Sequence, residues 1–188
     1  MVTLGAFADS PTASKREMAA DPRRPPYSCA VVAERIPELN EHWRVFDAVV
    51  EYARQLVGPD GTEELGYVMN GQIGVCDFTP NNPRARAINI IAEQWLVVTL
   101  GDAGGRWELN YTDEQLSLGR KIIAAAVAGR VEERQAFGRS RVTVTFEDGE
   151  TLSETGYNGC ASLFVPQLGW TRWGALTRYE PYRGENVG

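Results

Sequence analysis

Apolar residues recur at helical spacing in residues 41–57, EHWRVFDAVVEYARQLV. Spacings of three and four residues place side chains on one face of a helix, so this segment predicts an amphipathic helix that packs on a core. Asn40 can cap its N-terminus, and the Gly58-Pro59 pair ends it. The positions on the apolar face are Phe46, Val49, Val50, Ala53, Leu56 and Val57.

A second helix is predicted to begin after Thr112. The sequence TDEQ places Thr112 and Gln115 at the spacing of a capping box, in which each side chain bonds to the other's backbone amide. Gly129 is a favourable C-terminal stop because glycine tolerates the left-handed conformation that often ends helices. The expected buried positions are Leu116, Ile122, Ile123, Ala126 and Val127.

Two glycine-containing pairs predict β-hairpins. Asn70-Gly71 lies between residues 65–69 and 72–78, and Asp148-Gly149 lies within the alternating apolar and polar sequence of residues 141–155. Both pairs suit tight hairpin turns, whose central residues need positive φ angles. Each pair therefore predicts two antiparallel strands.

Further strands are predicted on both sides of these hairpins. Residues 86–100 divide into strands near 86–92 and 94–100, and the second pairs with residues 106–111 across GDAGG. The charged, alternating residues 131–137 suit an edge strand. ASLFVP and WGALTRYEPY add strands near the C-terminus. The predicted fold is α+β, an antiparallel β-sheet built from hairpins with two main helices packed on one face.

The glycine-rich turn GDAGGR, residues 101–106, raises the question of a phosphate site. A phosphate loop leads into a helix N-terminus and usually carries a lysine with serine or threonine. Here the apolar-polar run WELN follows Arg106, and no lysine is near. We therefore expect the turn to reverse the chain between two strands.

Length and charge restrict the class of protein. The chain has 188 residues, a net charge of −6 and a pI near 4.9. Residues 1–26, rich in Ser, Ala and Pro, predict a flexible arm before a single domain at 27–188. The negative charge disfavours nucleic acid as a partner. Without a membrane-spanning run or a signal peptide, we expect a cytoplasmic protein.

Arginine accounts for 17 of the 19 basic residues. Such a bias is typical of GC-rich genomes and predicts an actinobacterial source. Arginine also suits protein interfaces because its guanidinium contacts both carboxylates and aromatic faces. The three cysteines, Cys29, Cys76 and Cys160, are far apart in the sequence, so we do not expect a structural zinc site. We also expect no bound cofactor.

Catalytic motifs are sparse. His42 is the only histidine, and it sits in the first turn of the first predicted helix, where a surface position is expected. The carboxylates show no DxD or HExxH spacing. The alternative to a binding protein is a small-molecule enzyme or carrier with a pocket between helices and sheet. Either Cys76 or Asp77, near a hairpin end, is expected to line that pocket together with Tyr67.

Three loops are predicted to contact a partner protein. GWTRWG carries two tryptophans and an arginine, the residue types that concentrate binding energy at interfaces. TPNNPRAR is stiffened by two prolines, and GDAGGR is fixed by its hairpin. The alternative for the two tryptophans is that one packs on a helix while the other covers the sheet edge. The alternative for TPNNPRAR is a solvated hairpin connector. The predicted contact residues are Asn81, Asn82, Arg84, Asp102, Arg106, Trp170, Arg172 and Trp173.

The chain resembles bacterial immunity proteins, which block toxins of polymorphic or secreted toxin systems. The segments that carry the resemblance are EHWRVFDAVVEYARQLV, TDEQLSLGRKIIAAAVAG and GWTRWG, and the similarity in layout runs from Tyr27 to Tyr182. It points to the immunity factor of a mycobacterial-type secreted NAD-glycohydrolase (necrotizing) toxin.

That resemblance implies one-to-one inhibition in the cytoplasm by occlusion of the toxin's active site, without chemistry on this chain. It also implies that acidic charge speeds encounter with a basic cleft. A secretion chaperone would share most of these features.

Overall fold

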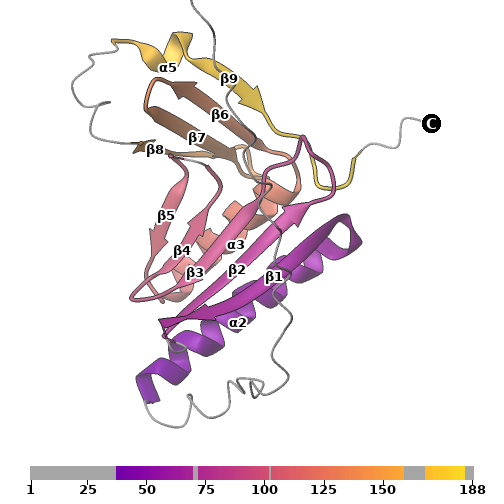
Figure 1. Ribbon diagram of the computed structural model, residues 1–188, viewed down its shortest axis with the longest axis vertical. Helices are drawn as coiled ribbons and strands as arrows, with labels where there is room; N and C mark the ends of the chain where they lie inside the picture. Colours follow the sequence, from indigo (N-terminus) through magenta and orange to yellow (C-terminus); the bar gives the residue numbers. More distant parts are fainter. Residues whose placement is uncertain (1–36, 70–71, 102, 159–167, 185–188) are drawn as a thin grey trace, which may run out of the picture.

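The computed structural model describes residues 37–69, 72–101, 103–158 and 168–184, and they form an α+β fold as predicted (Figure 1). The described strands divide into two antiparallel sheets, one in the order β1-β2-β3-β4-β5 and one in the order β8-β7-β6-β9. The predicted N-terminal arm, Asp102, the Asn70-Gly71 turn and the ASLFVP strand lie outside the described residues.

The first sheet is a meander in which each strand pairs with the next along the chain. The hairpin across residues 65–78 and the pairing across GDAGG are both confirmed. Alternation of buried and exposed residues along β2 and β3 gives the sheet one apolar face. Its strands are β1 (Gly61–Val68), β2 (Ile73–Pro80), β3 (Ile88–Ala92), β4 (Leu96–Thr99) and β5 (Arg106–Leu109).

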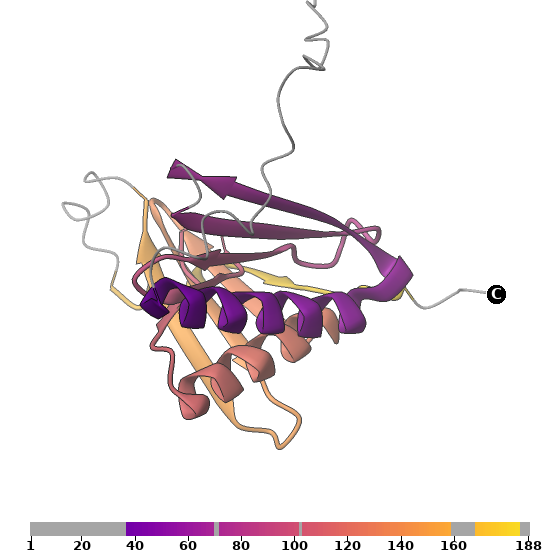
Figure 2. The ribbon, with the colours of Figure 1, turned by 90° about the horizontal axis from the view of Figure 1, so that it is seen from below.

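Helices α2 (Pro37–Val57) and α3 (Asp113–Val127) lie on the same face of this sheet (Figure 2). Helix α2 begins four residues earlier than the sequence predicted, so Asn40 lies inside the helix and is not its cap. Thr112 caps α3 as predicted, because its hydroxyl accepts a hydrogen bond from the Gln115 amide at 3.5 Å. No described helix has the length and apolarity needed to cross a membrane.

The second sheet packs beside α3 and contacts the first sheet through β5 and β8. The prediction of an edge strand at residues 131–137 is wrong, because β6 is paired on both sides, with β7 and with β9. Glu132 and Arg134 alternate with Val131 and Glu133, which are buried. The strands are β6 (Val131–Ala136), β7 (Arg139–Thr145), β8 (Thr151–Tyr157) and β9 (Ala175–Arg178).

Two short helices complete the described fold. The 3-10 helix η1 (Gly58–Asp60) joins α2 to β1, and α5 (Trp170–Trp173) immediately precedes β9. The residue before α5, Gly169, has a φ of 70°, which suits glycine at this sharp entry. Trp173, the first residue of the predicted strand WGALTRYEPY, therefore lies in a helical turn, and the strand itself covers only Ala175–Arg178.

One hydrophobic core joins both sheets and both long helices. Fully buried Phe46 of α2, Ile90 of β3, Ile123 of α3 and Val142 of β7 all belong to it. The two sheets and the two long helices therefore share one contiguous core.

The glycine-rich turn between β4 and β5 packs so closely against the second sheet that backbone atoms of the two are in direct contact. A Cβ atom on Gly156 of β8 would lie 1.7 Å from the carbonyl oxygen of Ala103. One on Gly104 would lie 2.5 Å from the carbonyl oxygen of Ser140. Glycine is therefore required on both sides of this contact, where the two sheets meet.

Candidate functional site: an aromatic–arginine face

Arginine side chains line the outer face of the second sheet. Strand register places Arg134 of β6 directly opposite Arg141 of β7, and Arg139 of β7 opposite Tyr157 of β8. Residues directly opposite one another share a face of an antiparallel sheet, and the alternate residue Val142 is buried in the core. The three arginines therefore lie on the face turned away from the core.

Carboxylates are few among the strand residues of this face that the structure describes. Among the described strand residues of this face, Glu132 is the only acidic residue, and it pairs with Arg178 at 2.8 Å. The Arg134 guanidinium instead donates to the carbonyl oxygens of Arg172 and Gly174, at 3.3 and 3.0 Å. The face is therefore basic, although the whole chain carries a net charge of −6.

Helix α5 lies at one end of this face (Figure 1). Its first and last residues are the two tryptophans of GWTRWG, and they differ in exposure. Trp170 is 8% exposed, and the Arg139 guanidinium lies 6.0 Å from its ring centroid and 5.4 Å from that of Tyr157. Trp173 is 60% exposed. Trp170 is thus covered by the protein itself on the face turned away from the core, whereas Trp173 is available to a partner.

The indole of Trp173 is held in place although it is exposed. Its N–H donates to the carbonyl oxygen of Leu168 at 3.0 Å. Phe137, at the turn between β6 and β7, and Leu168 are also largely exposed near this end of the sheet. We call the surface formed by the following residues the aromatic–arginine face: Arg134, Phe137, Arg139, Arg141, Tyr157, Leu168, Arg172 and Trp173.

The predicted contact loop at residues 79–86 has internal partners. The side chain of Asn81 donates to the carbonyl oxygen of Pro59 at 2.9 Å, and that of Asn82 donates to the carbonyl oxygen of Pro181 at 2.9 Å. Arg84, largely exposed, pairs with Glu180 at 2.9 Å. These contacts tie the loop to η1 and to the C-terminal segment, so its polar groups are already used within the fold.

The turn GDAGGR reverses the chain, and its amides bind a carboxylate of this same protein. The Gly104 amide donates to the Ser140 hydroxyl at 2.7 Å. The amides of Gly105 and Arg106 both donate to one carboxylate oxygen of Glu154, the latter at 3.0 Å. Successive amides of this kind form an anion-binding nest. Glu154 fills this nest, which agrees with the prediction that the turn is not a phosphate site.

Replacing Glu154 with alanine should lower the free energy of unfolding by about 2 kcal/mol, because two amides lose a charged acceptor and the Gly105 amide is buried. Glu154→Gln keeps an acceptor oxygen and should cost less. Urea denaturation measures both variants. Wild-type stability in Glu154→Ala would show that the nest contributes nothing to the contact between the sheets.

The residues considered for catalysis do not assemble into a site. His42 stacks on the Tyr111 ring, with centroids 4.0 Å apart, and no ion pair or hydrogen bond joins it to a described nucleophile or carboxylate. Cys76 and Asp77 are adjacent in β2 and point to opposite faces of the sheet. Asp77 accepts a hydrogen bond from Asn89 at 2.6 Å. At most one of Cys76 and Asp77 can therefore share a pocket with Tyr67, and Cys76 is fully buried.

Cys76 should be unreactive in the folded protein. Its side chain is fully buried, and burial raises the pKa of the thiol to about 12, so the nucleophilic thiolate is scarce. In a variant with Cys29→Ser and Cys160→Ser, a disulfide reagent should label Cys76 only after guanidinium is added. Rapid labelling in native buffer would contradict this placement of β2.

No group of three or more histidine, cysteine or carboxylate side chains that could hold a metal ion occurs in the described part of the chain. Glu133 is fully buried and accepts a hydrogen bond from the Tyr179 hydroxyl at 2.7 Å, so it has no access to a substrate. No family model matches the chain, and no curated protein or solved structure matches it.

Proposed function

We propose that this protein is a non-catalytic immunity protein that binds a cognate secreted toxin one to one and occludes its active site. The observation that carries the proposal is the aromatic–arginine face, with exposed Trp173 beside a basic surface on an otherwise acidic chain. The toxin class suggested by the sequence resemblance is an NAD-glycohydrolase.

Opposed arginines favour a partner that supplies negative charge. Arg134 and Arg141 stand directly opposite each other on neighbouring strands. Like charges in this position destabilise a sheet. Carboxylates of a partner would relieve the repulsion between the two arginines on binding, and this relief would stabilise the complex relative to the free protein.

Trp173 suits the role of a binding anchor. Tryptophan and arginine dominate the energetics of protein interfaces, and exposed aromatic surface is removed from water when a partner covers it. The hydrogen bond from the Trp173 indole to Leu168 fixes the ring before binding. A fixed side chain loses less conformational entropy when the complex forms.

The structure changes one expectation about charge. The resemblance implies that acidic residues of this chain meet a basic cleft, whereas the described face with exposed Trp173 carries Arg134, Arg139 and Arg141. We therefore propose that the toxin presents acidic residues around its active site. Electrostatic steering would then accelerate association, and added salt would slow it.

The direct test uses the product of the neighbouring reading frame. Purified protein should bind that product one to one in calorimetry, and it should abolish the product's NAD hydrolysis and its toxicity on co-expression. Binding without loss of activity would contradict occlusion. Absence of both binding and protection would contradict the immunity function.

A further inference from the structure

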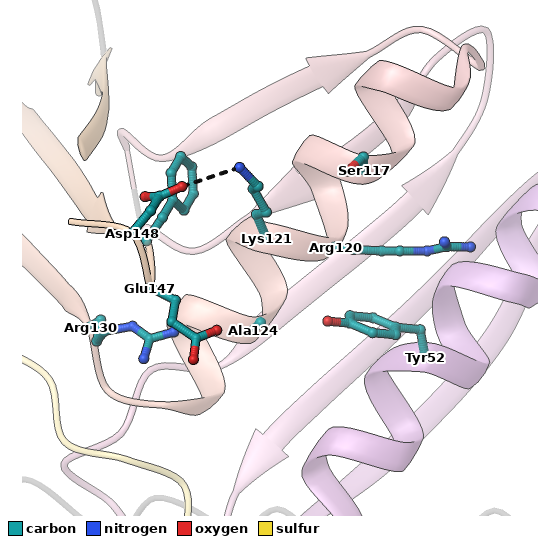
Figure 3. Close-up of a pocket in the computed structure, with 9 residues that line it drawn as sticks. Tyr52, Ser117, Arg120, Lys121, Ala124, Arg130, Glu147 and Asp148 are labelled. Atoms are coloured by element: carbon teal, nitrogen blue, oxygen red, sulfur yellow. Dashed lines mark hydrogen bonds and ion pairs between the residues drawn. The ribbon is translucent and has the colours of Figure 1, made fainter. Parts of the chain in front are cut away.

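A pocket of about 540 Å³ lies between α2, α3 and the turn that joins β7 to β8 (Figure 3). The volume falls within the range of small-molecule sites. The pocket is at the opposite end of β7 from Arg139, and hence from the aromatic–arginine face. A ligand bound in this pocket would therefore be separate from a partner on that face.

Helical spacing on α3 gives the pocket one of its walls. Ser117, Arg120, Lys121 and Ala124 are separated by three or four residues, so they lie on one face of the helix. Arg130, which follows the helix, also lines the pocket. Three cationic side chains, Arg120, Lys121 and Arg130, thus line this one pocket.

Two of these cations are positioned by aromatic rings. The Arg120 guanidinium lies 5.7 Å from the Tyr52 ring centroid, and the Lys121 ammonium lies 5.5 Å from that of Phe146. Figure 3 shows Arg120 extending from α3 toward Tyr52 of α2. Such contacts orient a cation without neutralising it.

The arginines at the pocket have more N–H donors than the hydrogen bonds they form with described residues of the protein. Within the described part of the chain, no acceptor bonds to the Arg120 guanidinium, although arginine carries five N–H donors. Arg130 uses its Nε to bond the carbonyl oxygen of Thr145 at 3.2 Å. Of the two carboxylates at the pocket, Asp148 is 3.5 Å from Lys121, and Glu147 makes no described ion pair.

We propose that this pocket binds a small oxyanion that carries two or more phosphate or carboxylate groups. Arg120 and Arg130 are its ligands, since planar guanidinium groups bind such oxyanions through paired hydrogen bonds. Lys121 adds positive charge. Glu147 opposes the anion and limits affinity.

The test is a calorimetric titration of the full chain at low ionic strength with two probes, pyrophosphate and citrate. Saturable binding of at least one probe to one site is expected. Arg120→Ala and Arg130→Ala should each weaken that affinity at least about tenfold. Binding of pyrophosphate alone would identify a phosphorylated ligand, and binding of citrate alone would identify a polycarboxylate.

Two further variants separate a local site from a general charge effect. Arg44→Ala removes an exposed arginine of α2 outside the pocket and should leave affinity unchanged. Glu147→Gln should strengthen binding several-fold, a gain that misfolding cannot produce. The proposal is overturned if neither probe shows saturable binding by roughly 10 mM, or if Arg44→Ala weakens binding as much as Arg120→Ala.

Discussion

Replacing Gly156 with alanine is expected to remove most of the stability of the fold. The added methyl group would lie 1.7 Å from the carbonyl oxygen of Ala103 and 2.3 Å from its carbonyl carbon. Both are backbone atoms, so the clash is relieved only if the two sheets move apart. We expect a loss of about 4 kcal/mol or more, a large part of the stability of a typical domain.

A matched glycine provides the control. Gly66 also lies in a strand, β1, but no atom lies within 4 Å of the position its Cβ would take. Gly66→Ala should change the free energy of unfolding by less than about 0.5 kcal/mol. Urea denaturation of both variants measures the difference. Equal stability of the two variants would contradict the close contact between the sheets.

Trp173→Ala is expected to weaken binding of the cognate toxin by about 2–4 kcal/mol, which is roughly 30-fold to 1,000-fold in Kd. The ring is 60% exposed in the free protein, so its removal should leave the stability of the fold nearly unchanged. Calorimetry with the product of the neighbouring reading frame measures the affinity, and urea denaturation measures the stability.

Trp95→Ala is the control for this change. Trp95 is 42% exposed and lies between β3 and β4 of the first sheet, away from the aromatic–arginine face. Its replacement should leave the affinity at the wild-type value. If Trp95→Ala weakens binding and Trp173→Ala does not, the partner uses the first sheet and the proposed interface is wrong.

Local patterns predicted most of the secondary structure. The Asp148-Gly149 pair and the alternation around it indicated β7 and β8, and Thr112 with Gly129 marked the ends of α3, because turns and caps depend on neighbouring residues. The position of β6 within its sheet was missed. Alternating charge shows that one face is solvated, but it does not show how many neighbours a strand has.

The interface between the sheets could not be predicted because its contacts join residues far apart in the chain. Gly156 meets Ala103, and Glu154 fills the nest formed by Gly105 and Arg106. The sequence did single out GWTRWG, but it could not separate buried Trp170 from exposed Trp173. That distinction depends on which ring packs over Arg139.

Hydrogen exchange of the complex with the toxin maps the surface of this protein that the toxin covers. Relative to the free protein, we predict slower exchange in residues 168–178 and at the turn between β6 and β7, with no change along β1. Slower exchange confined to β1 and α2 would contradict the assignment of the aromatic–arginine face as the toxin-binding surface.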